Sequence, residues 1–469
     1  MTVEGKTAAE HEFDLAVIGS GGAAMSAGIT AARAGRRVVL IERDTLGGTC
    51  VNIGCVPSKT LLAAAGARRG ALTNPFPGAP TSAAPVDLAA LVAQKDDLVA
   101  ALRDAKYAEV AAAYGFEVRP GQARFTDSET LQVDGTVVQA AAFVVATGAE
   151  PGVPDLPGLK AVDHLTSTTA MELRELPASL VVIGGGYVGM EQAQLFAHLG
   201  SRVSVVGRLA PQAEAEVADV IRAVFTEDGI TVVEDRAVSV GTDGHQVVVV
   251  TASGRRISGQ RLLVAAGRLP RTDGLGLAAA GITTDERGFI VIDEHQGTSN
   301  PRVFAAGDVT GSPQYVYVAA AGGRVAALNA LREDCCEQRK SVDYSGLPSV
   351  VFTRPQLASA GLTEAQAVAA GIACDCRVLP LADVPRALVN RDTRGVVKLV
   401  ADASTGRVLG VHAAADGAGE LMLAATYAIR AGMSVDDLAD TWAPYLTMAE
   451  SLRLVAGLFR SDMPTSCCA

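Results

Sequence analysis

Eight cysteines fall in four close pairs along this 469-residue chain: Cys50/Cys55, Cys335/Cys336, Cys374/Cys376 and Cys467/Cys468. Thiolates carry out two-electron redox chemistry and bind soft metal ions. Cys50 and Cys55 lie in the segment GGTCVNIGCVPSK, where we expect a helix to begin near Val56. Two thiols at this spacing can close a small disulfide ring, and a helix N-terminus favours the reactive thiolate. The first pair therefore predicts a redox-active or metal-binding site.

The pair at the end of the chain, Cys467/Cys468, favours metal binding over redox chemistry. Adjacent cysteines form only a strained disulfide ring, but on a mobile tail (residues 461–469) both thiolates can bind one soft ion. Hg(II) is the softest common candidate for such a pair. Cys335/Cys336 and Cys374/Cys376 match no pattern of this kind, and we interpret them as incidental.

Two glycine-rich loops predict two dinucleotide sites. Each follows a short apolar strand (Asp14–Gly19 and Leu180–Gly185) and precedes a helix, and their key positions are Gly19, Gly21, Gly22, Ala23 and Ala24 in the first loop and Gly184, Gly186 and Gly189 in the second. In a G-x-G-x-x-G/A loop the glycines permit a tight turn, close approach to a pyrophosphate and close helix packing. The free N–H groups of the helix N-terminus then bind the phosphates.

The residue that ends the second strand of each unit distinguishes the two ligands. Glu42 lies 23 positions after Gly19, where a carboxylate accepts the ribose hydroxyls of an unphosphorylated adenosine. The equivalent position after Gly184 is Gly207, and Arg208 follows it. A missing carboxylate beside a cation predicts that the second unit binds a 2′-phosphate, and therefore NADPH.

Composition limits the class of protein. The chain is 49% hydrophobic and 19% charged, which excludes intrinsic disorder, and its length suggests about three domains. A net charge of −11 argues against nucleic acid as a partner. We find no apolar run long enough for a membrane span and no leader peptide, and we expect a cytoplasmic protein.

The segment around Cys50 and Cys55 resembles the redox-active disulfide of the pyridine nucleotide–disulfide oxidoreductases. Three further segments are similar to the flavin and linker motifs of that family: VVATG at 144–148, AAGRLP at 265–270 and VFAAGD at 303–308. The resemblance implies that the first glycine loop binds FAD and the second NADPH. It also assigns Thr49, Lys59, Thr147, Gly148, Asp308 and Val316 to the FAD site, Tyr187 and Gly267 to the NADPH site, and a Lys59–Glu191 pair to the flavin–nicotinamide contact.

The same resemblance predicts an α/β fold with two Rossmann-like dinucleotide-binding domains and a C-terminal α+β dimerisation domain. We expect an N-terminal tail at 1–12, an FAD domain at 13–155 and 272–342, an NADPH domain at 156–271 and the dimerisation domain at 343–460. In this family the active sites are shared between the two subunits of a homodimer.

The C-terminal end distinguishes members of the family. Those that reduce disulfides need a histidine as a general acid, but Tyr445 occupies that position here, and a phenol with a pKa near 10 serves poorly. The segment PYLTMAE with a terminal SCCA is similar to the mercury(II)-reducing members. The resemblance implies that Tyr107 and Tyr445 line the site and that Cys467 and Cys468 pass Hg(II), taken from small thiols, to Cys50 and Cys55 of the other subunit.

Two alternatives stay open from the sequence. One is an FAD- and NADPH-dependent reductase of an unusual small disulfide. The other is a non-catalytic thiol-rich metal buffer, which would need neither of the nucleotide loops.

Overall fold

The computed structural model describes residues 11–332 and 338–460. The chain divides into two compact units. Unit 1 consists of Met1–Ser58, Ala93–Gly152 and Arg268–Asp343, and unit 2 consists of Lys59–Val92, Val153–Gly267 and Tyr344–Ala469.

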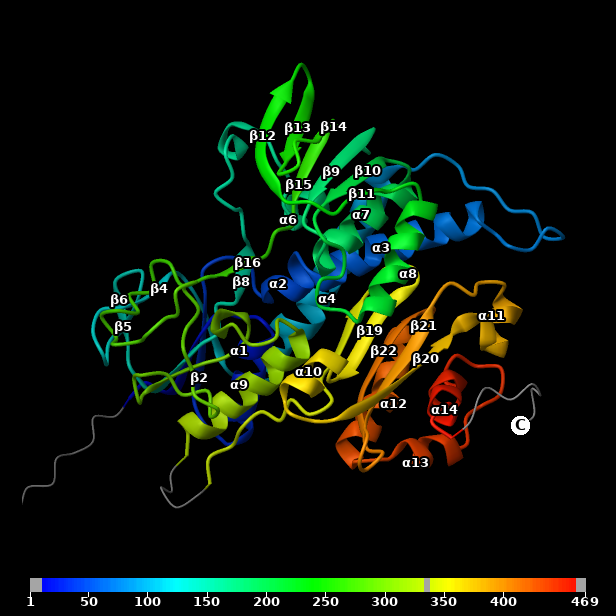
Figure 1. Cartoon of the computed structure of the whole chain (residues 1–469). Helices are drawn as coiled ribbons and strands as arrows, with labels where there is room; N and C mark the ends of the chain where they lie inside the picture. The colour runs from blue at the N-terminus through cyan, green and yellow to red at the C-terminus, as the bar shows by residue number, and fades with distance from the viewer. Residues whose placement is uncertain (1–10, 333–337, 461–469) are drawn as a thin grey trace, which may run out of the picture. The chain divides into compact units, whose positions relative to one another are not determined.

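Unit 1 contains a five-stranded parallel sheet. Its order is β17 (Val303–Ala305), β7 (Ala140–Val145), β1 (Phe13–Ile18), β2 (Val38–Glu42) and β3 (Glu117–Pro120). β1, β2 and β7 read as nearly continuous apolar runs because a parallel sheet is covered on both faces. Helices α1 (Gly22–Arg33) and α9 (Val316–Ala330) pack side by side on the sheet (Figure 1).

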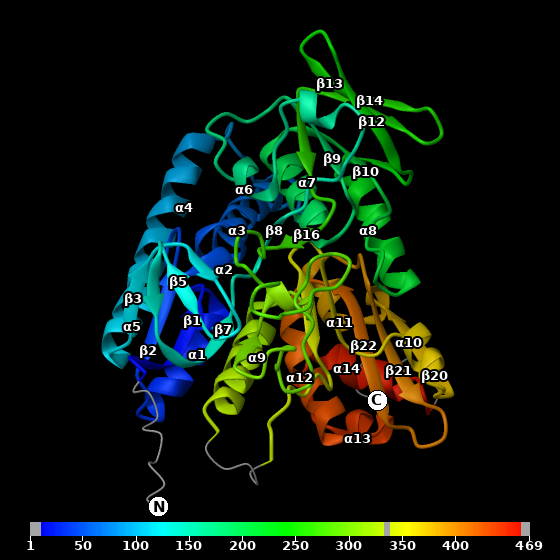
Figure 2. The same cartoon turned by 90° about the vertical axis from the view of Figure 1, so that its left-hand side faces the viewer.

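Smaller elements complete unit 1. An antiparallel sheet is formed by β4 (Ala123–Phe125), β5 (Leu131–Val133) and β6 (Thr136–Val138), and β8 (Ala149–Pro151) pairs with β16 (Arg268–Pro270). Helices α2 (Gly48–Asn52) and α5 (Glu109–Tyr114) also belong to this unit, as does the π-helical turn η1 (Asp104–Ala108). Figure 2 shows α5 beside β2 and β3.

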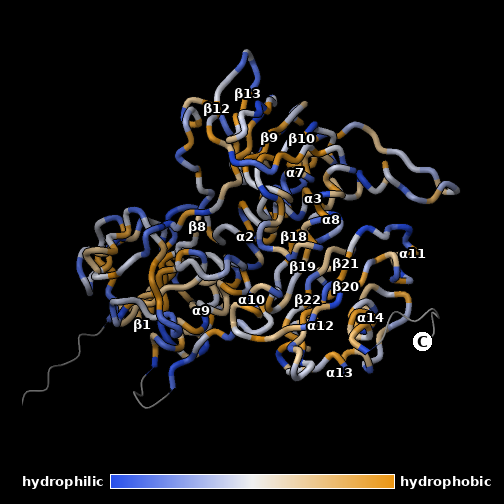
Figure 3. Tube along the Cα trace, in the orientation of Figure 1, coloured by the Kyte–Doolittle hydropathy of each residue, from blue (hydrophilic) through white to orange (hydrophobic). Residues whose placement is uncertain are grey.

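Unit 2 repeats the parallel arrangement with four strands. Their order is β11 (Thr231–Val233), β10 (Arg202–Val206), β9 (Ser179–Ile183) and β15 (Arg261–Val264). Helices α7 (Tyr187–Leu199) and α8 (Ala215–Glu227) pack on it, and an antiparallel sheet follows with β12 (Ala237–Asp243), β13 (Gln246–Thr251) and β14 (Arg256–Gly259). Hydrophobic residues are concentrated along β9 and β10 (Figure 3).

The C-terminal part of unit 2 is a five-stranded antiparallel sheet. Its order is β18 (Pro348–Val351), β19 (Gln356–Gly361), β22 (Val408–Ala415), β21 (Val396–Asp402) and β20 (Cys374–Pro380). Helices α12 (Ala418–Ala431) and α14 (Glu450–Gly457) bury one apolar face of this sheet, with α13 (Val435–Asp440) beside them (Figure 1). Helices α10 (Glu364–Ala369) and α11 (Pro385–Asn390) connect the strands.

The opposite face of this sheet carries a polar row. Ser349 pairs with Ser359, Ser359 with His412, and His412 with Lys398 in adjacent strands. Because directly opposed residues point to the same face, these four side chains cross the sheet on one side. Helix α8 packs against β21 and β22.

The predicted fold class is confirmed: two parallel α/β parts precede an α+β part. From the sequence we predicted three strands in the last domain, at 350–353, 396–400 and 408–412, and missed β19 and β20. Within the described residues, no helix combines the length and apolar character that crossing a bilayer requires.

Candidate active site

The first cysteine pair lies on two consecutive helices. Cys50 is in α2, and Cys55 is the first residue of α3 (Cys55–Leu72), one residue before the expected start. Cys50 is partly buried and Cys55 is exposed. Asn52 fixes the loop between them, because its amide donates to Leu46 O and Gly48 O and accepts from Arg103 Nε at 2.8 Å.

The cysteine loop is tied to the first glycine loop. Gly47 N donates to Ser20 Oγ at 2.9 Å, and Ser20 Oγ donates to Glu42 Oε2 at 2.5 Å. A Cβ on Gly48 would lie 2.6 Å from Gly21 Cα, so only glycine permits this approach. The segment that carries the cysteines is therefore held, at Gly47 and Gly48, against the loop that is predicted to bind the flavin. Sequence reasoning missed Ser20, although a serine between two glycines is a polar signal.

Tyr107, which lies far from the cysteines in sequence, is beside them in unit 1. Burial raises the pKa of Tyr107 to about 12, and negative charge on Cys50 and Cys55 adds to the effect. Its hydroxyl is therefore protonated at neutral pH and available as a hydrogen-bond donor.

Arg268 is a charged group near Cys55, and sequence reasoning missed it. Burial lowers the pKa of this guanidinium, while Asp308 and Cys55 act in the opposite direction. Arg268 also donates to Ala149 O at 2.5 Å. A cation held in this way offers positive charge to an anion formed on Cys55.

The residues predicted to bind FAD meet at the carboxyl ends of the strands of unit 1. Gly19 has φ of 109°, and a Cβ there would lie 2.4 Å from Ala146 O. Helix α1 begins at Gly22 with no side-chain cap and no acidic residue in its first turn, so its N–H groups and dipole can bind a phosphate. The others end or follow a strand or lie in the first turn of a helix: Ala23, Ala24, Glu42, Thr49, Thr147, Gly148 and Val316.

Asp308, the first residue of the 3₁₀ turn η3 (Asp308–Thr310), fits a hydroxyl-bearing ligand. Burial raises the pKa of its carboxyl group, and Arg268 opposes the shift. Arg268 Nε is 3.8 Å from Asp308 Oδ2, which is too long for a hydrogen bond. The carboxyl group therefore keeps acceptor capacity for a ligand hydroxyl, as a flavin ribityl chain would require.

The second glycine loop in unit 2 has the geometry of the first. Gly184 has φ of 115°, and a Cβ there would lie 2.3 Å from Ala265 O, nearly matching Gly19. Gly186 caps α7 without a side chain, Tyr187 is the first residue of α7, and Gly189 lies in its first turn. Gly267 follows β15 and Arg208 follows β10, where its side chain is exposed. An exposed cation at this strand end fits a 2′-phosphate.

Lys59, four residues after Cys55 in α3, forms an ion pair in unit 2. Its Nζ is 2.7 Å from Glu191 Oε2 and 4.7 Å from the centre of the Phe352 ring. The other carboxylate oxygen of Glu191 accepts Phe352 N at 2.9 Å. Both oxygens of a buried carboxylate are therefore used, and the ammonium is held between an anion and an aromatic face. Sequence reasoning predicted the pair but missed Phe352.

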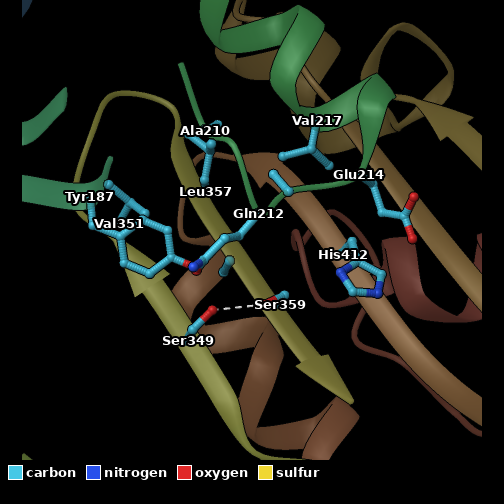
Figure 4. A pocket seen from close by; sticks show the side chains of 12 residues that line it. Tyr187, Ala210, Gln212, Glu214, Val217, Ser349, Val351, Leu357, Ser359 and His412 are labelled. Carbon is cyan, nitrogen blue, oxygen red and sulfur yellow. Dashed lines mark hydrogen bonds between the residues drawn. The ribbon is translucent and has the colours of Figure 1, made fainter. Parts of the chain in front are cut away.

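Tyr187 also lines a pocket of unit 2 on the polar face of the C-terminal sheet (Figure 4). The ring points towards Val351 and Gln212, and Ser349 and Ser359 face the same space with their hydroxyls 2.7 Å apart. Gln212 belongs to the segment that follows Arg208. Tyr187, which is predicted to belong to the NADPH site, is thus next to the segment expected to bind the 2′-phosphate.

The remaining predicted residues lie near the C-terminus. Tyr445 is in the loop between α13 and α14 and is about half exposed. Glu450, five residues later, is buried; its Oε1 contacts Arg453 at 3.2 Å, and its Oε2 has no hydrogen-bond partner within the described residues. Cys467, Cys468, Cys335 and Cys336 lie outside the described residues.

The part of the chain that the structure describes contains no group of three or more His, Cys, Asp or Glu residues arranged for a metal ion. A metal at Cys50 and Cys55 would therefore be bound by these two thiolates. Soft ions accept such a two-ligand site.

Comparisons with known proteins identify relatives of this chain. The family model for pyridine nucleotide-disulphide oxidoreductases matches residues 13–323, and the model for their dimerisation domain matches 347–456. A mercuric reductase of Streptomyces lividans is 52% identical over 97% of this chain and 98% of its own. One from Lysinibacillus sphaericus is 47% identical over 98% of this chain and 85% of its own.

Solved structures show the same fold. The HOCl-induced flavoprotein disulfide reductase RclA from Escherichia coli is 32% identical, with a TM-score of 0.84 over 95% of this chain and 99% of its own.

Proposed function

The chain belongs to the pyridine nucleotide–disulphide oxidoreductase family, and on that basis we propose that it is an NADPH-dependent mercury(II) reductase. The observation that carries this proposal is its 52% identity, over nearly the full length of both chains, to a mercuric reductase. FAD and NADPH are its cofactors, and the dimerisation domain makes it a homodimer. These properties disfavour a passive metal buffer, because a buffer needs no electron donor.

Two sets of residues hold the cofactors in this proposal. Gly19, Gly21, Gly22 and the start of α1 bind the FAD pyrophosphate, Glu42 its adenosine ribose and Asp308 its ribityl chain, with Ala23, Ala24, Thr49, Thr147, Gly148 and Val316 around them. Gly184, Gly186 and Gly189 bind the NADPH pyrophosphate, Arg208 its 2′-phosphate, and Tyr187 and Gly267 the remainder. When bound, FAD accepts a hydride from NADPH and supplies an electron pair to the disulfide or the thiolate-bound metal.

Cys50 and Cys55 bind the substrate as a two-thiolate complex. Hg(II) arrives from small thiols on Cys467 and Cys468 of one subunit and moves by ligand exchange to Cys50 and Cys55 of the other. Each exchange forms one Hg–S bond as another breaks, so the metal is never free. Two electrons convert the bound ion to Hg(0), both thiolates remain on the protein, and the neutral atom leaves.

The other side chains position the reaction. Tyr107 donates a hydrogen bond at the thiol pair, and Tyr445 lines the same site from the partner subunit. Lys59 and Glu191 fix the charge at the flavin–nicotinamide contact. No step needs the histidine that disulfide reductases use, because no departing thiol has to be protonated by a side chain at position 445.

We further propose the domain limits 13–155 with 272–342 for FAD, 156–271 for NADPH and 343–460 for dimerisation. Residues 461–469 form the delivery segment. A cytoplasmic location supplies the NADPH and the small thiols that this chemistry uses.

The test is NADPH oxidation by the purified holoenzyme with Hg(II) in excess small thiol, while mercury vapour is trapped from the headspace. We expect NADPH consumption with volatile mercury, and loss of turnover at low thiol excess in a Cys467→Ala/Cys468→Ala variant. Consumption of NADPH only with a disulfide, or only with oxygen, would overturn the mercury assignment. Turnover unaffected by the double substitution would overturn delivery by the tail.

A further inference from the structure

The polar face of the C-terminal sheet carries a cysteine pair that the proposed reaction does not use. Cys374 and Cys376 are both partly exposed and lie at the start of β20, the edge strand of the sheet. Cys374 pairs with Asp402 and Cys376 with Val400 of β21. Because they are two residues apart in a strand, both side chains point to the same face.

The spacing of this pair suits a bridging atom better than a disulfide. Two residues of extended strand separate the Cα atoms by about 6.6 Å. That is close to the upper limit of about 6.8 Å for a disulfide, and parallel side chains would have to turn sharply to close one. A metal ion between the sulfurs relaxes this requirement, since two metal–thiolate bonds of the zinc length span about 4.6 Å.

A carboxylate lies next to the pair. The carboxylate of Glu364, the first residue of α10, lies beside the Cys376 thiol. Glu364 Oε2 is also 2.8 Å from Lys398 Nζ, so its position is fixed. The carboxylate therefore places fixed negative charge beside the thiol pair, which attracts a cation.

We propose that Cys374 and Cys376 form a second soft-metal site, which binds one Hg(II) ion as a two-coordinate bis-thiolate complex. Loading proceeds by ligand exchange from a complex with two small thiolates. Each cysteine forms one Hg–S bond as one bond to a small thiolate breaks, and the cysteine proton passes to the departing thiolate. The oxidation state of the metal does not change.

This site goes beyond the proposed function, because it takes the same ion without reducing it. Both proposed ligands lie in β20 of unit 2, and β20 pairs with β21 rather than with a strand that carries a nucleotide loop. Metal bound there is stored or withheld from turnover.

The test measures bound metal in a full-length variant that keeps only this pair, with Cys50, Cys55, Cys335, Cys336, Cys467 and Cys468 replaced by alanine. The holoprotein is loaded with Hg(II) in millimolar cysteine as competing thiol, without NADPH, and passed through gel filtration. Flavin absorbance confirms that it is folded. We expect one mercury per chain, with two sulfur neighbours by X-ray absorption, and at least a tenfold loss of retained mercury in the same protein with Cys376→Ser.

A second measurement guards against misfolding of the substituted protein. Wild-type holoenzyme and its Cys374→Ser/Cys376→Ser variant are loaded in parallel, and the variant should retain one mercury fewer per chain. Equal retention by these two proteins, or no mercury on the protein that keeps only this pair, would overturn the proposal. Neither measurement involves turnover, so either result is independent of whether the enzyme reduces Hg(II).

Discussion

Replacing Lys398 by methionine should destabilise the protein strongly, and less so in acid. The Lys398 side chain is 3% exposed, and its Nζ lies 3.0 Å from Glu214, 3.1 Å from Glu216 and 2.8 Å from Glu364. Methionine fills a similar volume but leaves three carboxylates facing one another without a cation. The comparison therefore measures the charge network rather than a cavity.

The magnitude follows from the exposure of each carboxylate. Breaking a buried ion pair typically costs about 3–5 kcal/mol because a charge is left desolvated. Only Glu214 is buried, at 9% exposure, whereas Glu216 and Glu364 are 38% and 49% exposed and can be solvated. Exposed pairs contribute about 0–1 kcal/mol each. We therefore expect a loss near the lower end, about 3 kcal/mol at neutral pH.

The pH dependence has a definite sign. The hydrogen bond from Lys398 lowers the pKa of Glu364 in the wild type, so that stabilisation is present above the ordinary value of about 4.3 and is lost as pH falls through the lower folded pKa. Burial works against the charge of Lys398, yet its hydrogen bonds to Glu364 and Glu214 raise its pKa above the usual range. Its contribution is therefore lost only above about pH 10.

In the Lys398→Met variant the carboxylates change the stability with pH in the opposite direction. Without a cation, mutual repulsion favours their protonated forms, so the variant gains stability as pH falls from about 7.5 towards 5. The difference between wild type and variant should therefore shrink in acid.

The measurement is urea unfolding of both holoproteins, followed by circular dichroism at the two pH values. The matched control is Lys160→Met, because the Lys160–Asp155 pair is 89% and 93% exposed and its removal should leave the unfolding midpoint unchanged. A loss below about 1 kcal/mol for Lys398→Met would refute the argument, since an exposed pair costs as much. A loss of stability that is larger at about pH 5 than at about pH 7.5 would also refute it.

Three further predictions concern the catalytic machinery. Arg208→Ala should lower kcat/KM for NADPH about 10- to 100-fold, the value of a charged hydrogen bond, and leave that for NADH nearly unchanged; equal losses would contradict 2′-phosphate binding. Gly184→Ala should prevent NADPH binding, measured by fluorescence titration, because its Cβ would lie 2.3 Å from Ala265 O, while flavin content is retained; loss of both together would show general misfolding. Tyr107→Phe should slow Hg(II) reduction about tenfold with little change in KM. Because the pKa of Tyr107 is about 12, the pH profile of the wild-type rate should show no ionisation of this phenol below about pH 10. An inflection below pH 10 that disappears in Tyr107→Phe would contradict the assigned protonation state.

Local spacing made the two nucleotide loops and the cysteine loop predictable. In each, the chemistry lies within a few residues of a strand end and a helix start, as for Gly19 and Gly184, whose Cβ positions meet equivalent carbonyls. Strand β19 (QLASAG) and β20 (CDCRVLP) were missed because small and charged residues give little strand signal. Their partners β22 and β21 determine their conformation.

Residues that act across the fold gave no local signal. Arg268 contacts Asp308 and influences Cys55, more than 200 positions away, because β16 pairs with β8 beside the parallel sheet. In the sequence Lys398 only interrupts an apolar strand, and its role becomes clear from the structure, where it bonds to Glu214 and Glu364. Such partners follow from tertiary packing and not from sequence spacing.

The two cysteine pairs in the described residues contain the same side chains but differ in their surroundings. Cys55 begins an 18-residue helix and lies near the positive charge of Arg268, so the protein supplies positive charge where an anionic sulfur would form. Cys376 lies in a strand beside the carboxylate of Glu364, and burial raises its pKa to about 12. A thiol of this kind is a poor nucleophile at neutral pH. The protein therefore equips the first pair for thiolate chemistry, whereas a metal that binds at the second pair must displace a tightly held proton.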